Sequence, residues 1–418
     1  MLWCGNSASQ SIATKMVKGT FSPHVIIPAL GITQILAWGS SYYLPAVLAG
    51  PIAKDTGWSL SWVAGGLSLG LLIAGLASPT VGRYIHRMGG RPVLATSAGL
   101  LALGLGALAA APNLPCFFAA WAILGLGMGT GLYDPAFSTL GRLYGQRARH
   151  HIATLTLFGG FASTICWPLS AFLVTHLGWR GTCLTYAAIQ LCLCLPLYLL
   201  ALPRTSKEGD VRKERADEAA NAPNVPQSVF ILLALTITIS SVVSTLISVH
   251  LLTILQDRGI LLAAAVALGA IVGPCQVGAR FTEMLVAKYH HPIWVKIASV
   301  SLVATGLSLL WANIPAVFLA LIFYGAGIGL ESIARATLPL ALFGPKDYPP
   351  IMGKLARPSL MAQAAAPSVG AVMIQFFGTS EALGVVVCVA LINVVLVLSL
   401  FGISRATIAQ GAASASHL

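Results

Sequence analysis

Residues 78–92 read Ser-Pro-Thr-Val-Gly-Arg-Tyr-Ile-His-Arg-Met-Gly-Gly-Arg-Pro and connect two long apolar runs, residues 59–80 and 93–111. Each run has about the 20 apolar residues that a helix needs to cross a bilayer. The connecting stretch carries three arginines and no acidic residue. Because loops rich in Arg stay on the cytoplasmic side of a membrane, the sequence predicts a membrane hairpin whose turn faces the cytoplasm.

The composition of the whole chain is that of a membrane protein. Of its 418 residues, 57% are hydrophobic and 9% are charged, and the mean hydropathy is +0.84. So few charges cannot cover a water-facing surface, and apolar runs of spanning length recur along the chain. We interpret the net charge of +12 as cytoplasmic Lys and Arg that fix the orientation in the lipid bilayer, and we expect no nucleic-acid partner.

Twelve helical spans in two sets of six fit the apolar runs and the positions of the basic residues. With both termini in the cytoplasm, most Lys and Arg, Lys296 included, fall on the cytoplasmic side, whereas Lys54, Arg180 and Arg258 stay outside. This bias follows the positive-inside rule. The expected all-α membrane protein has five parts: a cytoplasmic tail (1–24), a six-helix bundle (25–202), a cytoplasmic linker (203–227), a second six-helix bundle (228–403) and a cytoplasmic tail (404–418).

The two halves share a pattern of small residues. A proline followed by three glycines spaced two apart occurs in each half: Pro115, Gly125, Gly127, Gly129 and, 200 positions later, Pro315, Gly325, Gly327, Gly329. An internal repeat of this length, with six spans in each copy, is typical of two-domain transporters. The glycines are expected to let neighbouring helices pack closely.

The loop between the second and third spans also resembles a family signature. Gly82, Arg87, Gly89 and Arg91 match the pattern Gly-x-x-x-Asp-Arg-x-Gly-x-Arg of the major facilitator superfamily, and His86 stands where the pattern has Asp. Together with the spans and the repeat, the resemblance implies the fold of that superfamily, with two six-helix bundles around a cavity that opens alternately to each side. It further implies a transporter, not an enzyme, of the bacterial uptake-permease type.

Charged residues inside the predicted spans are few. Glu331 and Arg335 are four residues apart on the tenth span, where they can pair directly, and Asp134 lies at nearly the matching depth of the fourth span. Because a charge within a membrane costs several kcal/mol unless it is paired or hydrated, we predict that this cluster binds solute or exchanges a proton. The alternative is a permanently neutralised cluster that only joins the halves.

A second group of residues is predicted to form a gate on the cytoplasmic side. It comprises the loop residues Gly82, Arg83, His86, Arg87 and Arg91, together with the pair Arg280 and Glu283 at the end of the eighth span. Salt bridges that break when a cavity opens bias such two-state elements. A static pair at a helix end is the alternative interpretation.

The solute itself is expected to meet aromatic and neutral polar side chains. The candidates for substrate binding are Gln34, Trp38, Ser41, Tyr42, Ser244, His250, Tyr324, Arg335 and Gln363. Such side chains can stack on a flat ring and hydrogen-bond neutral groups, although contacts between helices would use the same residue types. The scattered cysteines and histidines indicate no metal site, and we expect no cofactor.

These observations predict a monomeric secondary transporter of a small organic solute in a bacterial-type inner membrane, with a proton as the co-transported ion. The chain contains no Walker loop, so ATP is not the expected energy source. Uptake of a flat heterocycle is the first hypothesis for the solute, and riboflavin is the example to test, because the chain is similar to vitamin permeases of the superfamily. Three alternatives stay open: a monocarboxylate or other organic anion held by Arg335, efflux of a drug or metabolite, and a transport-incompetent membrane sensor.

Overall fold

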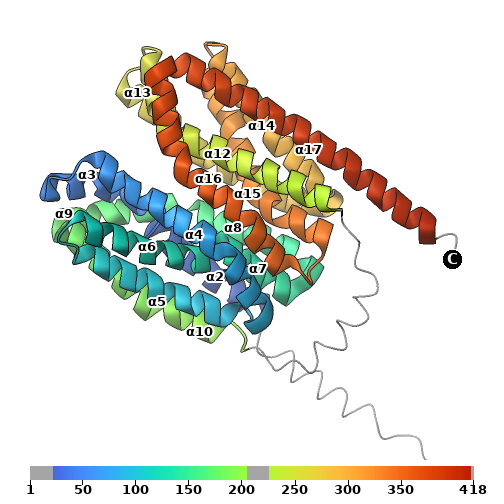
Figure 1. Ribbon diagram of the computed structural model, residues 1–418, viewed down its shortest axis with the longest axis horizontal. Coiled ribbons are helices and arrows are strands. Elements are labelled where there is room, and N and C mark those ends of the chain that lie inside the picture. The colour runs from blue at the N-terminus through green and yellow to red at the C-terminus, as the bar shows by residue number, and fades with distance from the viewer. Residues whose placement is uncertain (1–21, 205–225, 416–418) are drawn as a thin grey trace, which may run out of the picture.

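The computed structural model describes residues 22–204 and 226–415, and every regular element in these two ranges is a helix. Lys15 and Lys18, with most of the expected N-terminal tail and linker, lie outside the described residues. Figure 1 shows the helices before and after residues 205–225 as two separate groups that lie side by side.

The first group contains the helices up to residue 201. Its elements are α2 (Pro23–Gly39), α3 (Leu44–Thr56), α4 (Leu60–Met88), α5 (Gly90–Ala109), α6 (Leu114–Gly131), α7 (Tyr133–Tyr144), η1 (Gly145–Arg147), α8 (Ala148–Gly160), α9 (Ala162–Ile189), η2 (Gln190–Cys194) and α10 (Leu195–Ala201). The second group contains α12 (Gln227–Asp257), α13 (Leu262–Val286), η3 (Ala287–Tyr289), α14 (Pro292–Trp311), α15 (Val317–Phe343), α16 (Tyr348–Phe377) and α17 (Thr379–Ala415).

The described residues contain ten helical segments that are long and apolar enough to cross a membrane. One of them, Leu114–Ala201, has 88 residues, whereas about 20 suffice for one crossing. The chain breaks within it at Gly145 (φ 56°) and at Gly178 (φ 68°). Positive φ values are readily accessible to glycine alone, so these two residues permit turns inside an otherwise apolar stretch.

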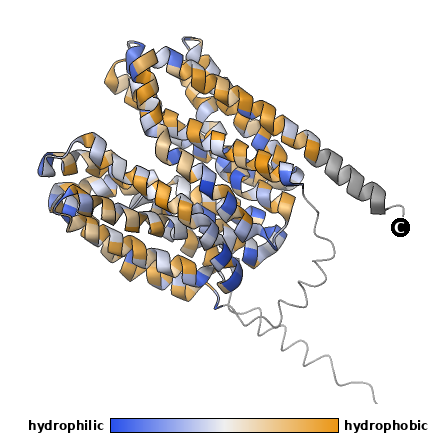
Figure 2. Ribbon diagram, in the orientation of Figure 1, coloured by the Kyte–Doolittle hydropathy of each residue, from blue (hydrophilic) through white to orange (hydrophobic). Residues whose placement is uncertain are grey.

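The outer surface of the helices is apolar. Large side chains such as Leu200 and Phe376 are 83% and 73% exposed, and Figure 2 shows hydrophobic residues along most of the helix surfaces and hydrophilic ones toward the helix ends and between the two groups. An apolar surface of this extent is stable in lipid and not in water. The chain is therefore a multi-pass membrane protein.

The repeated glycines hold equivalent places in the two groups. A Cβ at Gly125 would lie 2.5 Å from the carbonyl oxygen of Gly70 on α4, and a Cβ at Gly325 would lie 2.9 Å from that of Val272 on α13. Gly127 and Gly327 face the opposite neighbours, α5 and α14. Because spacing by two turns successive glycines to different sides of a helix, α6 and α15 are each packed tightly between two others.

Candidate functional site

A cavity of about 1440 Å³ lies between the two groups of helices and is lined by residues of both. On α4 its lining begins at Leu60 and Ser61, in the first turn, and ends at Ser78, ten residues before the helix does. On α13 the lining runs from Gly269 to Arg280. The cavity therefore opens at the end of the molecule where α4 begins and is closed at the end where α4 finishes.

Direct backbone packing between α4 and α16 closes that end. A Cβ at Gly82 would lie 2.4 Å from the carbonyl oxygen of Pro349, and a Cβ at Gly353 would lie 2.4 Å from that of Ser78. Only glycine allows two helices from opposite groups to approach this closely. Gly82, which was predicted to be a gating residue, is thus located in the contact between the groups.

The other loop residues surround this contact. Arg142 of α7 donates to the carbonyl oxygens of Ile85 (2.8 Å) and His86. Arg83 donates to Oγ1 of Thr80 (3.0 Å), and Arg91 donates to the carbonyl oxygen of Leu199 on α10 (2.6 Å). Arg87 is exposed in the last turn of α4. These contacts fix the end of α4 within its own group.

A second set of contacts joins the groups at the closed end. Arg149 of α8 lies 3.4 Å from Glu283 of α13 and donates to the carbonyl oxygen of His290 (2.6 Å). Nε2 of His290 lies 3.3 Å from Glu283. The predicted pair of Arg280 with Glu283 is therefore wrong: Glu283 pairs across the two groups with Arg149, because α8 brings its own cation to the end of α13.

Arg280 points into the cavity instead. Its guanidinium donates to the carbonyl oxygens of Thr156 (3.0 Å) and Gly329 (3.4 Å) and to Oε1 of Gln276 (3.4 Å). Gly160 of α8 leaves room for it, since a Cβ there would lie 2.8 Å from Nη1. Within the described residues its hydrogen bonds go to neutral oxygens, so its positive charge faces the cavity without a bonded carboxylate.

Both acidic residues of the cavity form ion pairs: Asp134 pairs with Arg335, a member of the predicted cluster, and Glu331 pairs with Lys296, which the sequence had not assigned to it. Asp134 of α7 lies 2.9 Å from Nη2 of Arg335 on α15, which links the two groups. Glu331 lies 2.5 Å from Nζ of Lys296 on α14. The direct pair of Glu331 with Arg335 is thus not formed, because the side chains one turn apart find partners on different helices.

Lys296 was predicted to be a cytoplasmic topology residue, and the structure shows that this is wrong. It is fully buried, with an exposed fraction of 0%. The signal was present in the sequence, since the residue falls four positions into the apolar run that forms α14. An ionisable side chain inside such a run is a functional candidate in its own right.

Aromatic side chains form the wall of the cavity near Arg280. Trp38 packs against Tyr133 and Tyr42, with ring centroids 5.0 and 5.2 Å apart. Tyr43 lies 5.9 Å from Trp38, and Tyr43 and Tyr133 are close enough to Arg280 to interact with its charge. The arrangement combines an aromatic surface with one cation, which suits an organic group that carries an anion.

The remaining predicted binding residues divide into two sets. Gln34 and Ser41 are 0% exposed and do not line the cavity; they donate to the carbonyl oxygens of Gly131 (2.7 Å) and Ala37 (2.6 Å). Their packing role explains why a shared helical face was misleading. The residues that do line the cavity are Trp38, Tyr42, Ser244, His250, Tyr324, Arg335 and Gln363.

Comparison with known sequences points to one family. The family model described as Major Facilitator Superfamily matches residues 30–296, which is more than half of the chain. Monocarboxylate transporter 11 of Mus musculus is 33% identical over 168 residues, which cover 37% of this chain and 35% of that protein. Monocarboxylate transporter 13 of Rattus norvegicus is 31% identical over 134 residues, 32% of this chain and 30% of that protein. These matches span about a third of the relatives' length.

Solved structures of similar fold extend over nearly the whole chain. The proton:xylose symporter XylE superposes with a TM-score of 0.70 at 14% identity, covering 90% of this chain and 96% of XylE. The human organic anion transporter MFSD10 gives 0.69 at 16% identity, covering 90% and 99%. The Escherichia coli fucose:proton symporter FucP gives 0.65 at 15% identity, covering 92% and 99%. At these identities the likeness concerns the fold.

Proposed function

Because the chain belongs to the major facilitator superfamily, and so is a secondary transporter and not an enzyme, we propose that it moves a small organic anion with one carboxylate across the membrane, together with a proton. The single observation that carries the proposal is the surplus positive charge of Arg280 in the central cavity. The transport direction that we propose is uptake into the cell.

The proposed topology follows from the breaks in the long apolar segment. Turns at Gly145 and Gly178 would divide Leu114–Ala201 into three crossings, which gives twelve in all, with residues 25–202 and 228–403 as the two bundles and both termini in the cytoplasm. The cavity then opens outward, and the α4–α16 contact is the cytoplasmic gate. The membrane would be a bacterial-type inner membrane and the protein a monomer.

The charge balance of the cavity supports an anionic substrate. Asp134 neutralises Arg335, and Glu331 neutralises Lys296. Arg280 remains as the described cavity cation whose hydrogen bonds reach neutral oxygens. An uncompensated charge that is 6% exposed is costly, and a carboxylate that binds there removes this cost through a charge-assisted hydrogen bond.

Some of the similar proteins support this choice of substrate class, whereas XylE and FucP are sugar symporters. Relatives with 31–33% identity over parts of their length are monocarboxylate transporters, and one protein of similar fold is an organic anion transporter. In the earlier hypothesis Arg335 held the anion. The salt bridge of Arg335 to Asp134 leads us to propose Arg280 for that role and to propose Arg335 for the gate.

A flat heterocycle such as riboflavin is the second candidate. The observation that favours it is the aromatic wall formed by Trp38, Tyr42, Tyr43 and Tyr133, where ring stacking is available. Ser244, His250 and Gln363 would provide hydrogen bonds to its polar groups. This candidate does not require the charge of Arg280.

Uptake of labelled solutes by proteoliposomes separates the two candidates. We expect the wild-type protein to take up a labelled monocarboxylate and Arg280→Gln to lose about 10- to 150-fold in affinity, the equivalent of one charge-assisted hydrogen bond. Arg180→Gln is the matched control, because Arg180 pairs with Asp55 at the exposed end of α3 and lies outside the cavity. Riboflavin uptake that is unchanged in Arg280→Gln, without carboxylate uptake, would refute the proposal; efflux of the same carboxylate would overturn only its direction.

A further inference from the structure

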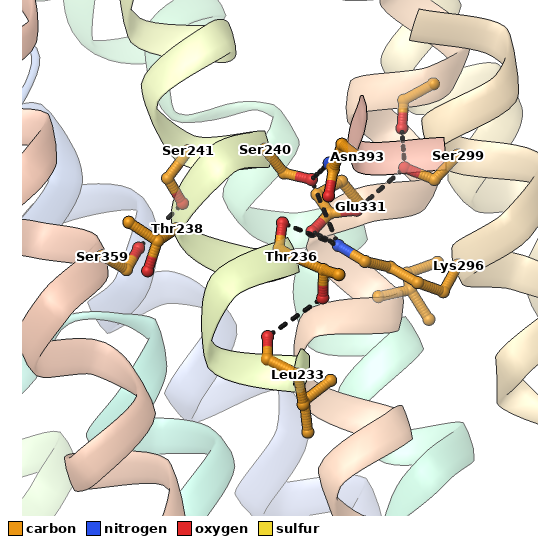
Figure 3. A network of polar contacts seen from close by, with 12 residues as sticks. Leu233, Thr236, Thr238, Ser240, Ser241, Lys296, Ser299, Glu331, Ser359 and Asn393 are labelled. Carbon is orange, nitrogen blue, oxygen red and sulfur yellow. Dashed lines mark hydrogen bonds and ion pairs between the residues drawn. The ribbon is translucent and has the colours of Figure 1, made fainter. Parts of the chain in front are cut away.

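We propose that Glu331 is the residue that carries the co-transported proton, and that Lys296 behind it is a positioning residue which holds the carboxylate in place. The proposal rests on the transport function above and decides between the two acidic residues of the cavity. Figure 3 shows the polar network that carries it.

The network surrounds Lys296 with oxygen atoms from two helices, α12 and α15. Nζ of Lys296 lies 2.5 Å from Oε1 of Glu331, 3.1 Å from Oγ of Ser240 and 3.5 Å from the carbonyl oxygen of Thr236. Ser299 donates to Oε2 of Glu331 (2.9 Å). The carboxylate therefore has a fixed orientation, with one oxygen on the ammonium and the other on a hydroxyl (Figure 3).

The two partners differ in their access to water. The side chain of Glu331 is 16% exposed and lines the cavity, whereas that of Lys296 is 1% exposed and lies behind it. A proton can reach the carboxylate from cavity water without passing the lysine. The ammonium cannot leave the network, because water is not available to solvate it. Glu331 is thus an acid accessible to water that is paired with a buried cation.

The network also contains a buried acceptor without a partner in the described part of the chain. Asn393 of α17 donates through Nδ2 to Oγ of Ser240 (2.9 Å), the same atom that contacts Lys296. Its Oδ1 is buried and has no hydrogen-bond partner among the described residues. A buried acceptor without a donor is unusual in a folded protein. A protonated Glu331 brings a new O–H donor into this network.

The ion pairs Asp134–Arg335 and Lys296–Glu331 are placed differently relative to the two groups of helices, and this difference indicates different roles. Asp134 and Arg335 belong to different groups, so alternating access must break this pair. Lys296 and Glu331 both belong to the second group, so the pair moves as one body and keeps its geometry when the cavity changes sides. A proton carrier needs such a constant site that meets water first on one side and then on the other.

Other titratable groups near α15 surround this site. Charged or titratable side chains on the helices packed against α15, besides Lys296, include Arg280 and Glu283 on α13, Asp134 on α7, His250 on α12, Tyr348 on α16 and Arg149 on α8, and α15 itself carries Tyr324 and Arg335. Arg280 is joined to α15 two residues before Glu331, through the carbonyl oxygen of Gly329. A substrate carboxylate on Arg280 would therefore bind close to Glu331.

The transport step that follows is balanced in charge. A proton from cavity water adds to one Oε of Glu331, a carboxylate anion binds Arg280, and both leave on the other side after the cavity reorients. One anion and one proton cross together, so no net charge moves. Return of the empty protein leaves Glu331 ionised and paired with Lys296, as in the structure.

Infrared titration of purified protein without substrate tests the proton site independently of the transported solute. We expect a protonated-carboxyl band that grows on acidification in the wild type, is absent in Glu331→Gln and persists in Asp134→Asn. In Lys296→Met this band should broaden, because the carboxyl group is no longer held in one orientation by the ammonium. Should Lys296→Met fail to fold, Lys296→Met/Glu331→Gln leaves no uncompensated charge and should fold without the band.

Transport measurements complete the test. Glu331→Gln should lose accumulation driven by a pH gradient while still exchanging internal for external solute. A band that survives in Glu331→Gln and disappears in Asp134→Asn would overturn the proposal, as would a band of unchanged width in Lys296→Met. A band assigned to Glu331 in a protein that moves no carboxylate would instead refute the proposed substrate and leave the proton site standing.

Discussion

Alanine in place of Gly353 should weaken the closed end of the cavity. The added Cβ would lie 2.4 Å from the carbonyl oxygen of Ser78 and 3.1 Å from Cα of Pro79, both on α4. Ordinary contacts begin near 3.4 Å, so the two helices must separate by about 1 Å. Both atoms belong to the backbone of another helix, so no flexible side chain can move aside to relieve the contact.

The expected cost falls on one conformation of the transporter. Overpacking of this kind costs about 1–3 kcal/mol, and it applies only while α4 and α16 touch. The equilibrium should therefore shift about 5- to 150-fold toward the conformation in which this end is open. The higher helix propensity of alanine, up to about 1 kcal/mol, acts in both conformations and cancels.

Distances between spin labels measure this shift. Labels at Arg147 and Lys346 report on the closed end, and labels at Lys54 and Gln256 report on the open end; all four residues are exposed. In Gly353→Ala the first distance should lengthen and the second shorten. Gly99→Ala on α5 is the matched control, because nothing lies within 4 Å of its added Cβ. Equal distance distributions in the two variants would refute the reasoning.

Three further predictions concern the contacts around the cavity. Asp134→Asn should leave Arg335 without its carboxylate and raise the population that is open at the α4–α16 end by about tenfold or more, measured with the same labels; an unchanged population would show that the bridge does not hold the gate. Gly160→Ala should displace the guanidinium of Arg280, which lies 2.8 Å from the position of the new Cβ. The KM for carboxylate should rise several-fold with little change in expression; an unchanged KM would show that Arg280 does not bind the substrate. Burial, and next the charge of Arg149, lower the pKa of His291 at the closed end. The closed state therefore binds fewer protons there and should lose stability as the pH falls through about 6.5. His291→Asn keeps a capping side chain for α14 and should make the label distances at this end less sensitive to pH; equal sensitivity in the variant and the wild type would contradict the assignment.

The sequence was sufficient for the all-helical membrane fold, because that fold depends on features that extend over whole segments. Apolar runs and repeated glycines are properties of whole segments, and Gly125 and Gly329 occupy the tight helix contacts that their spacing indicated. The fold is also shared with known transporters. What sequence patterns could not supply was the partner of each charge.

The partner of each charged side chain depends on which helices become neighbours. Glu331 and Arg335 are adjacent on one helix face, and the i, i+4 rule favoured their pairing. In the structure, α14 presents Lys296 to one and α7 presents Asp134 to the other. Asp134 had been grouped with Arg335, which it contacts, whereas Lys296 was counted with the cytoplasmic lysines, although its position inside an apolar run was visible.

Binding of a monocarboxylate and of its uncharged amide to the purified protein, measured by isothermal titration calorimetry, tests the central claim most directly. The surplus charge of Arg280 predicts that the carboxylate binds about 10- to 150-fold more tightly than the amide, and that Arg280→Gln abolishes this difference. Equal affinity of the wild-type protein for the two ligands would contradict the account.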